Sequence, residues 1–155
     1  MIKVEENLNN LGIHIPDAPT PVGAYKPAII SGNIMFVSGQ LPIEKGKLKY
    51  KGKVGSDISL DDGVHASKIA AINILSVMRQ ELGDLDKINR ILKLTGYVAS
   101  APGFDMQAKV VNGASELFYQ VFGENGIHAR AAVGVFELPL GAPVEIEAIA
   151  EIVYK

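Results

Sequence analysis

One arginine stands out among the side chains that could carry chemistry. Arg130 lies in the run HARAAVGV (residues 128–135), where its neighbours are small or apolar. A guanidinium in such a setting costs free energy unless an anion satisfies it, and a carboxylate can do so through two parallel hydrogen bonds. That carboxylate could belong to a bound ligand, or it could be Glu147 or Glu151 of the protein itself. The pattern leaves both interpretations open.

The second candidate is Glu145, which lies in a segment of alternating character. One face of a strand would carry Glu145, Glu147, Ile149 and Glu151, and the other Val144, Ile146, Ala148, Ala150 and Ile152. Residues 138–141 (LPLG) place Pro and Gly at turn positions, so we predict that residues 129–137 and 144–153 form a hairpin. In that register Arg130 opposes Ile149 and shares a face with Glu145. Their Cα atoms would lie about 14 Å apart, which suits the flanking of a small molecule better than an ion pair.

The other polar residues favour no alternative chemistry. The three histidines, at positions 14, 65 and 128, lack metal-ligand spacing, and the chain has no cysteine, which excludes disulfides and thiolate sites. Neither a nucleophile-elbow motif nor a dinucleotide-binding motif is present, so Ser38 is not indicated as a hydrolase nucleophile. We therefore expect neither a metal nor a cofactor.

Lysine occupies every second position from Lys45 to Lys53. In an extended chain these lysines would lie on one face, and we interpret them as a solvated edge that discourages strand-to-strand aggregation. A phosphate-binding loop is disfavoured, because five residues separate Gly46 from Gly52 and Val54 stands where a hydroxyl residue is needed. The net charge of -2 gives no general attraction to nucleic acid or anionic membranes.

A fold of helices and strands must position these residues, and 155 residues is an ordinary length for one domain. Apolar spacing and capping residues predict helices over residues 2–12, between Ser59 and Gly83, and ahead of Gly123. Strands are predicted at residues 28–30, 34–37, 90–99, 129–137 and 144–153, and a proline-rich loop at 17–27. This order predicts an α+β fold, a mixed sheet with both long helices on one face. The other face is semi-polar, which suits a subunit interface.

The chain shows no secretion or membrane signal. Glu5 and Glu6 stand where a signal peptide needs a positive start and an unbroken apolar run, and no apolar run approaches the roughly 20 residues that a bilayer-spanning helix needs. We expect a cytoplasmic, soluble protein of one domain over residues 1–155. Residues 1–14 would be an N-terminal extension, and residues 45–56 a lysine-rich loop or edge segment.

Five sequence blocks, in this order along the chain, resemble the motifs of a known family. They are residues 21–25 (PVGAY), residues 36–42 (FVSGQLP), Asn112, the pair Ala129-Arg130, and residues 138–150 (LPLGAPVEIEAIA). They resemble the signatures of the Rid family, the YjgF-type reactive intermediate deaminases, also known as L-PSP endoribonucleases or translation initiation inhibitors. The resemblance implies a chorismate-mutase-like fold of the bacillus type and a homotrimer with three clefts between subunits. It also implies cofactor-free hydrolysis of 2-imino and enamine acids, released by pyridoxal-phosphate dehydratases, to 2-keto acids and ammonia.

The resemblance also assigns roles to residues. Arg130 would hold the substrate carboxylate, and Glu145 would position or polarise the attacking water. Tyr25 would close the cleft from a neighbouring subunit, and the cleft would be lined by Ser38, Gly39 and Asn112. Many members carry Cys two residues after the motif Arg, whereas Ala132 stands here and would contribute only through its backbone. Two alternatives remain: a non-catalytic trimeric module that binds small carboxylates, and an RNA-directed translation inhibitor or endoribonuclease.

Overall fold

The computed structural model describes residues 3–21 and 23–154, which form a five-stranded sheet, a two-stranded hairpin and three α-helices. In chain order the elements are α1 (Val4–Asn10), β1 (Ala28–Ser31), β2 (Ile34–Gln40), β3 (Ile43–Glu44), β4 (Lys47–Leu48), α2 (Leu60–Leu82), β5 (Ile88–Ala99), α3 (Gln107–Phe122), β6 (Ala129–Val135) and β7 (Val144–Ile152). Short 3₁₀ helices occupy Leu85–Lys87, Gly123–Gly126 and Pro139–Gly141. The predicted order of helices and strands is confirmed, and the small β3–β4 hairpin is an addition to it.

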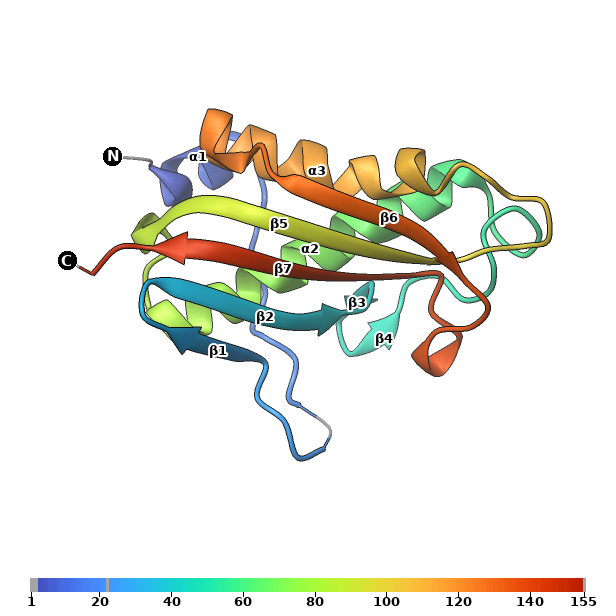
Figure 1. Ribbon diagram of the computed structural model, residues 1–155, viewed down its shortest axis with the longest axis horizontal. Coiled ribbons are helices and arrows are strands. Elements are labelled where there is room, and N and C mark those ends of the chain that lie inside the picture. The colour runs from blue at the N-terminus through green and yellow to red at the C-terminus, as the bar shows by residue number, and fades with distance from the viewer. Residues whose placement is uncertain (1–2, 22, 155) are drawn as a thin grey trace.

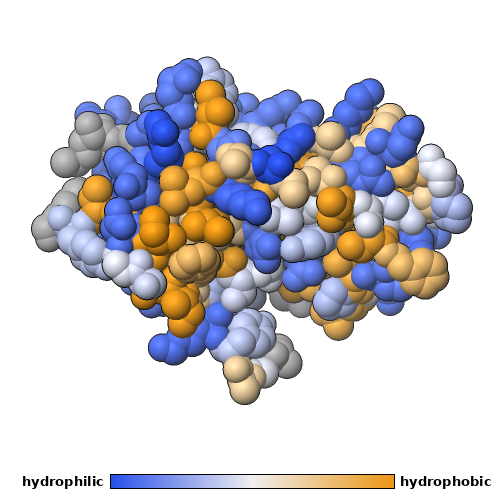
Figure 2. Space-filling view, in the orientation of Figure 1, coloured by the Kyte–Doolittle hydropathy of each residue, from blue (hydrophilic) through white to orange (hydrophobic). Residues whose placement is uncertain are grey.

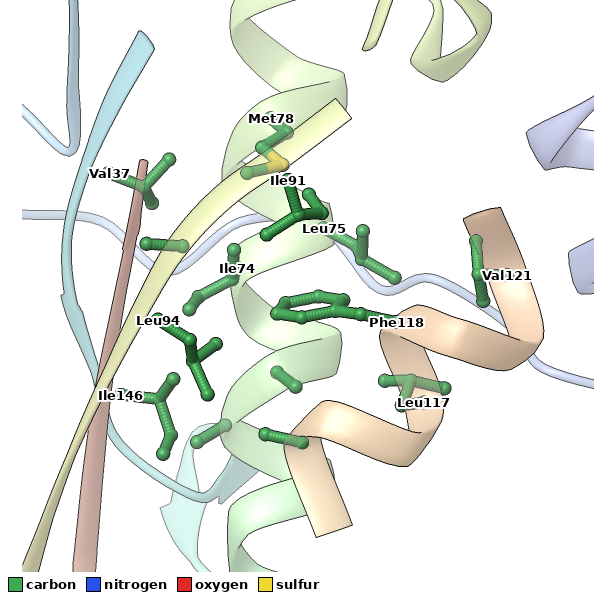
Figure 3. Packing of buried hydrophobic residues seen from close by; sticks show 14 of the residues in the cluster. Val37, Ile74, Leu75, Met78, Ile91, Leu94, Leu117, Phe118, Val121 and Ile146 are labelled. Carbon is green, nitrogen blue, oxygen red and sulfur yellow. The ribbon is translucent and has the colours of Figure 1, made fainter. Parts of the chain in front are cut away.

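The two long helices lie side by side on one face of the sheet, as predicted (Figure 1). The large sheet has the strand order β1-β2-β7-β5-β6, in which only β5 and β6 run parallel. The core fills the space between the helices and the sheet, and Figure 3 shows Phe118 of α3 reaching toward Leu75 of α2. No helix in the described part of the chain is long and apolar enough to cross a membrane.

Local signals explain where α2 begins and ends. The side chain of Ser59 accepts a hydrogen bond from the backbone N–H of Asp62, and two acidic residues lie in the first turn. Gly83 ends the helix with a φ of 75°, a left-handed conformation that glycine adopts without strain. The helix therefore has the boundaries that the sequence predicted.

The predicted hairpin between the last two strands is wrong. β6 pairs in parallel with β5, placing Arg130 opposite Leu94, and β7 lies between β2 and β5, placing Glu145 opposite Tyr97. Residues 136–143 cross the end of β5 and therefore span two strand spacings, about 10 Å. A parallel pair needs a long crossover, and α3 supplies it between β5 and β6. The turn residues at 138–141 end β6 without folding it back onto β7.

The lysine-rich segment is also not the extended edge that its alternation predicted. Lys45 has a φ of 50° and lies in the tight turn between β3 and β4, and Gly46 and Gly52 also have positive φ values. Lys49 pairs with Glu44 at 3.8 Å. Lys53 lies 3.7 Å above the ring of Phe136. These bends prevent the five lysines from sharing one face.

The face of the sheet opposite the helices carries exposed apolar side chains. The alternation predicted for β7 is confirmed, because its even-numbered residues are buried under the helices and its odd-numbered ones are half-buried on the other face. Ile29 and Phe36 are about half exposed beside Ile149, and Figure 2 shows hydrophobic residues gathered over this part of the sheet. We call this surface the open face.

Candidate functional site

Arg130 points toward α3 rather than toward the open face. Its strand partner Leu94 is fully buried under the helices, and residues paired across a sheet point the same way. Its Nη1 donates to Asn112 Oδ1 at 2.7 Å and to Ser115 Oγ at 3.1 Å. Among the described residues, no carboxylate lies within ion-pair distance of it. The guanidinium is thus held by neutral acceptors, and no carboxylate of the described residues pairs with it.

The interpretation of Arg130 as a partner of Glu147 or Glu151 is therefore wrong. Glu147 accepts a hydrogen bond from the hydroxyl of Tyr97 at 2.9 Å, and Glu151 accepts from the side chains of Asn33 and Asn89. All of these groups lie away from α3, on strands or in the turn beside them.

A hollow of about 300 Å³ adjoins Arg130 at the edge of the sheet. It is lined by Asn112, Ser115, Tyr119, Gly126, Ile127, His128 and Arg130. Ala132, two residues along β6, also faces the helices and packs against the core. Asn112, Arg130 and Ala132 therefore lie on the helix side of the sheet, and we call them the arginine group.

Glu145 lies on the open face and is half-buried against β2. Burial, followed by the negative charge of Glu147, raises the pKa of its carboxyl group above the ordinary value. A Cβ on Gly39 would lie 2.3 Å from Glu145 Oε1, so only glycine allows the carboxylate this position. A carboxyl group with a raised pKa is suited to taking and returning a proton near neutral pH.

Ser38 and Tyr25 are linked through the backbone. Ser38 Oγ donates to the carbonyl of Lys26 at 2.8 Å, and its backbone N–H donates to the carbonyl of Pro27 at 2.9 Å. Ser38 thereby fixes the end of the loop that carries Tyr25, whose side chain is 55% exposed. Ser38 also lines a hollow of about 300 Å³ on the open face, beside Glu147. Ser38, Gly39 and Glu145 form the glutamate group.

The two groups lie on opposite sides of one sheet, so the expected shared face of Arg130 and Glu145 is wrong. Tyr97 pairs with Glu145 on one side and with Val133 on the other, which puts the odd-numbered residues of β6 on the open face. Arg130 is even-numbered, and successive residues of a strand point to opposite faces, so Arg130 lies on the helix side. One subunit therefore does not bring all the predicted residues together.

Sequence reasoning missed two residues of the site, Ser115 and His128. Ser115 follows Asn112 by three positions on α3, and His128 precedes Arg130 by two positions, so each shares a face with a residue already singled out. These two spacings could have identified Ser115 and His128, but only after the structure had placed Arg130 beside α3. His65 instead lies away from the site, with its Nδ1 2.6 Å from the hydroxyl of Tyr50.

The fold and the sequence match known proteins along nearly the whole chain. Residues 5–152 match the family described as "YjgF/chorismate_mutase-like, putative endoribonuclease". Protein TCP17 of Trypanosoma cruzi is 42% identical over 151 residues, which are 97% of this chain and 94% of that protein.

Two crystal structures have closely similar folds. Protein Atu1372 of Agrobacterium tumefaciens, described as of unknown function, is 48% identical with a TM-score of 0.91 over 97% of this chain and 92% of that one. A protein of Shewanella oneidensis, described as a "putative endoribonuclease", is 31% identical with a TM-score of 0.93 over 96% of this chain and 99% of that one. With the family match over residues 5–152, these similarities show that the chain belongs to the YjgF/Rid family.

Proposed function

We propose that this protein hydrolyses reactive 2-imino and enamine acids to 2-keto acids and ammonia without a cofactor. The observation that carries the proposal is the state of Arg130, whose guanidinium is held by two neutral side chains beside a hollow and meets no carboxylate in the described chain. Such a group can bind a small carboxylate through two parallel hydrogen bonds. The substrate is a small acid, and enzymes that use pyridoxal phosphate supply it.

The complete site is a cleft between subunits of a homotrimer. The arginine group and the glutamate group lie on opposite sides of the sheet, so the Arg130 of one subunit serves the Glu145 of a neighbour. The open face supports this arrangement, because half-exposed apolar residues beside half-buried carboxylates suit an interface that encloses a polar site. Tyr25, exposed on its loop, closes the cleft.

The chemistry needs positioning more than a strong nucleophile, because an imine carbon is already activated toward water. Arg130 holds the carboxylate, and Glu145 takes a proton from a water molecule as the water oxygen bonds to the imine carbon. The same proton passes to the nitrogen and gives a carbinolamine. Its C–N bond then breaks as the hydroxyl proton moves to the departing nitrogen, which releases ammonia and leaves a 2-keto acid. The raised pKa of Glu145 makes its carboxylate a better base for the first step.

The proposal is tested by supplying an imino acid from threonine dehydratase and measuring the initial rate of 2-ketobutyrate formation above spontaneous hydrolysis. Arg130→Ala removes a charge-assisted contact worth about 2–4 kcal/mol, so kcat/KM should fall roughly 30- to 1000-fold. Arg130→Lys keeps the charge without the planar fork and should recover only part of the activity. Arg90→Ala, which removes an exposed arginine bonded to Asn125, is the matched control.

Two outcomes would contradict this function. An Arg130→Ala protein of unchanged assembly with nearly wild-type turnover would remove Arg130 as the carboxylate anchor. A wild-type protein that binds 2-ketobutyrate without accelerating hydrolysis would instead favour the non-catalytic binding module.

An RNA-cleavage activity is the remaining alternative, because the family and the similar Shewanella oneidensis protein are both described with the words "putative endoribonuclease". The structure offers it little support. His65 and His128 lie in separate hydrogen-bonded pairs, and the lysine-rich segment bends at Lys45 and Gly52 instead of running as one extended strand. Nuclease-free protein should therefore leave a labelled RNA intact. Cleavage that disappears when Lys45 to Lys53 are neutralised would support the alternative.

A further inference from the structure

A chain of hydrogen bonds runs from the backbone to Arg130. His128 Nδ1 lies 2.6 Å from the carbonyl oxygen of Gly126, and His128 Nε2 lies 3.0 Å from Ser115 Oγ. Ser115 Oγ in turn lies 3.1 Å from Arg130 Nη1. The ring of Phe118 packs edge-on against the histidine at 6.1 Å between centroids, which holds the imidazole in place.

The chemistry of the groups determines the direction of each bond. A carbonyl oxygen can only accept, so His128 carries a hydrogen on Nδ1 and donates it to Gly126. Burial lowers the pKa of His128. The hydrogen bond to Gly126 opposes this shift and the charge of Arg130 adds to it, so the neutral ring is favoured and Nε2 accepts. The hydroxyl hydrogen of Ser115 must then point to His128, which turns an oxygen lone pair toward the N–H of Arg130.

This arrangement uses one end of the guanidinium and leaves the other available. Nη1 carries two hydrogens, and Asn112 and Ser115 accept one each. The edge formed by Nε and Nη2 makes no hydrogen bond within the described residues, and this edge has the two-donor geometry that matches a carboxylate.

We propose that Ser115 and His128 are positioning residues that fix Arg130 Nη1, so that the Nε–Nη2 edge receives the substrate carboxylate. The inference rests on the proposed function for its substrate, and it adds that the affinity for the carboxylate depends on a serine and a histidine that do not touch it. Ser115 and Asn112 lie three residues apart on α3, so both acceptors of Nη1 are carried by a helix and not by a loop.

Kinetics with matched variants test the proposal. Ser115→Ala removes one acceptor and should raise KM for the imino acid about 3- to 10-fold with a smaller change in kcat, because carboxylate binding is shared by substrate and transition state. Ser115→Thr keeps the hydroxyl and should restore most of the affinity. His128→Gln keeps an acceptor and should be milder than His128→Phe. Ser76→Ala, which removes a hydroxyl bonded only within α2, is the control.

Nitrogen-15 NMR of the wild type and variants gives a readout that does not need turnover. The wild type should show His128 with its hydrogen on Nδ1 and one defined Arg130 Nε–H signal. That signal should broaden or shift in Ser115→Ala and return in Ser115→Thr. If the wild type shows no deamination but these spectral changes occur, the proposed function fails and the positioning role stands.

Two results would overturn the positioning role itself. One is a hydrogen on Nε2 of His128, which would reverse the chain of bonds. The other is a Ser115→Ala protein that deaminates with wild-type KM and gives a wild-type Arg130 signal.

Discussion

At the scale of single residues, the environment of Glu145 sets a dependence of stability on pH. Its pKa is higher in the folded protein than in the unfolded chain, so folding favours the protonated form. The wild type should therefore lose stability as the pH rises from the ordinary range of a carboxyl group through the raised pKa. Glu145→Gln cannot ionise, so its unfolding midpoint should exceed that of the wild type at pH 8, and the gain should vanish toward pH 4.

Urea unfolding across this pH range, at one protein concentration, measures the effect. Glu116→Gln, which removes an exposed carboxyl from α3, is the control for a general change of net charge. A Glu145→Gln protein that is less stable than the wild type at pH 8 would show that the carboxylate is stabilised where it lies.

At the scale of elements, the contact between the two long helices depends on Gly113. A Cβ added there would lie 2.1 Å from the backbone oxygen of Val64, which cannot move without displacing α2. Gly113→Ala should therefore destabilise the fold by about 3 kcal/mol, at the upper end for overpacked cores. Gly63→Ala is the matched control, because its nearest neighbours are side-chain methyl groups of Val54 and Val110 at 3.2–3.4 Å that can shift. Thermal unfolding of both variants separates the two cases, and equal melting temperatures would contradict the argument.

At the scale of the whole molecule, the open face should be buried between subunits. Sedimentation at micromolar concentration should give a particle of three times the 16.5 kDa chain mass. Phe36→Asp places a charge among the apolar side chains of this face and should release folded monomers without deaminase activity. Leu11→Asp, which changes an exposed residue of the N-terminal region, should stay trimeric. A wild-type monomer would contradict both the interface and the shared site.

Several features were determined by the sequence itself, because they depend on neighbours along the chain. The cap at Ser59 and the stop at Gly83 act within one turn of α2, and the turn at residues 31–33 joins β1 to β2. The alternation along β7 assigned each of its residues to the correct face, because successive side chains of a strand point in opposite directions. Arg130 was singled out by its charge among small, apolar neighbours, and Glu145 by its place in a segment of alternating polarity.

The tertiary structure decided how these residues combine. β6 pairs with β5 residues that lie 36 positions earlier in the chain, and no turn sequence encodes a partner at that distance. That pairing turned Arg130 toward Asn112 and Ser115 and separated it from Glu145 by the thickness of the sheet. The face of a strand residue follows from its register, and register between distant strands depends on packing across the whole core.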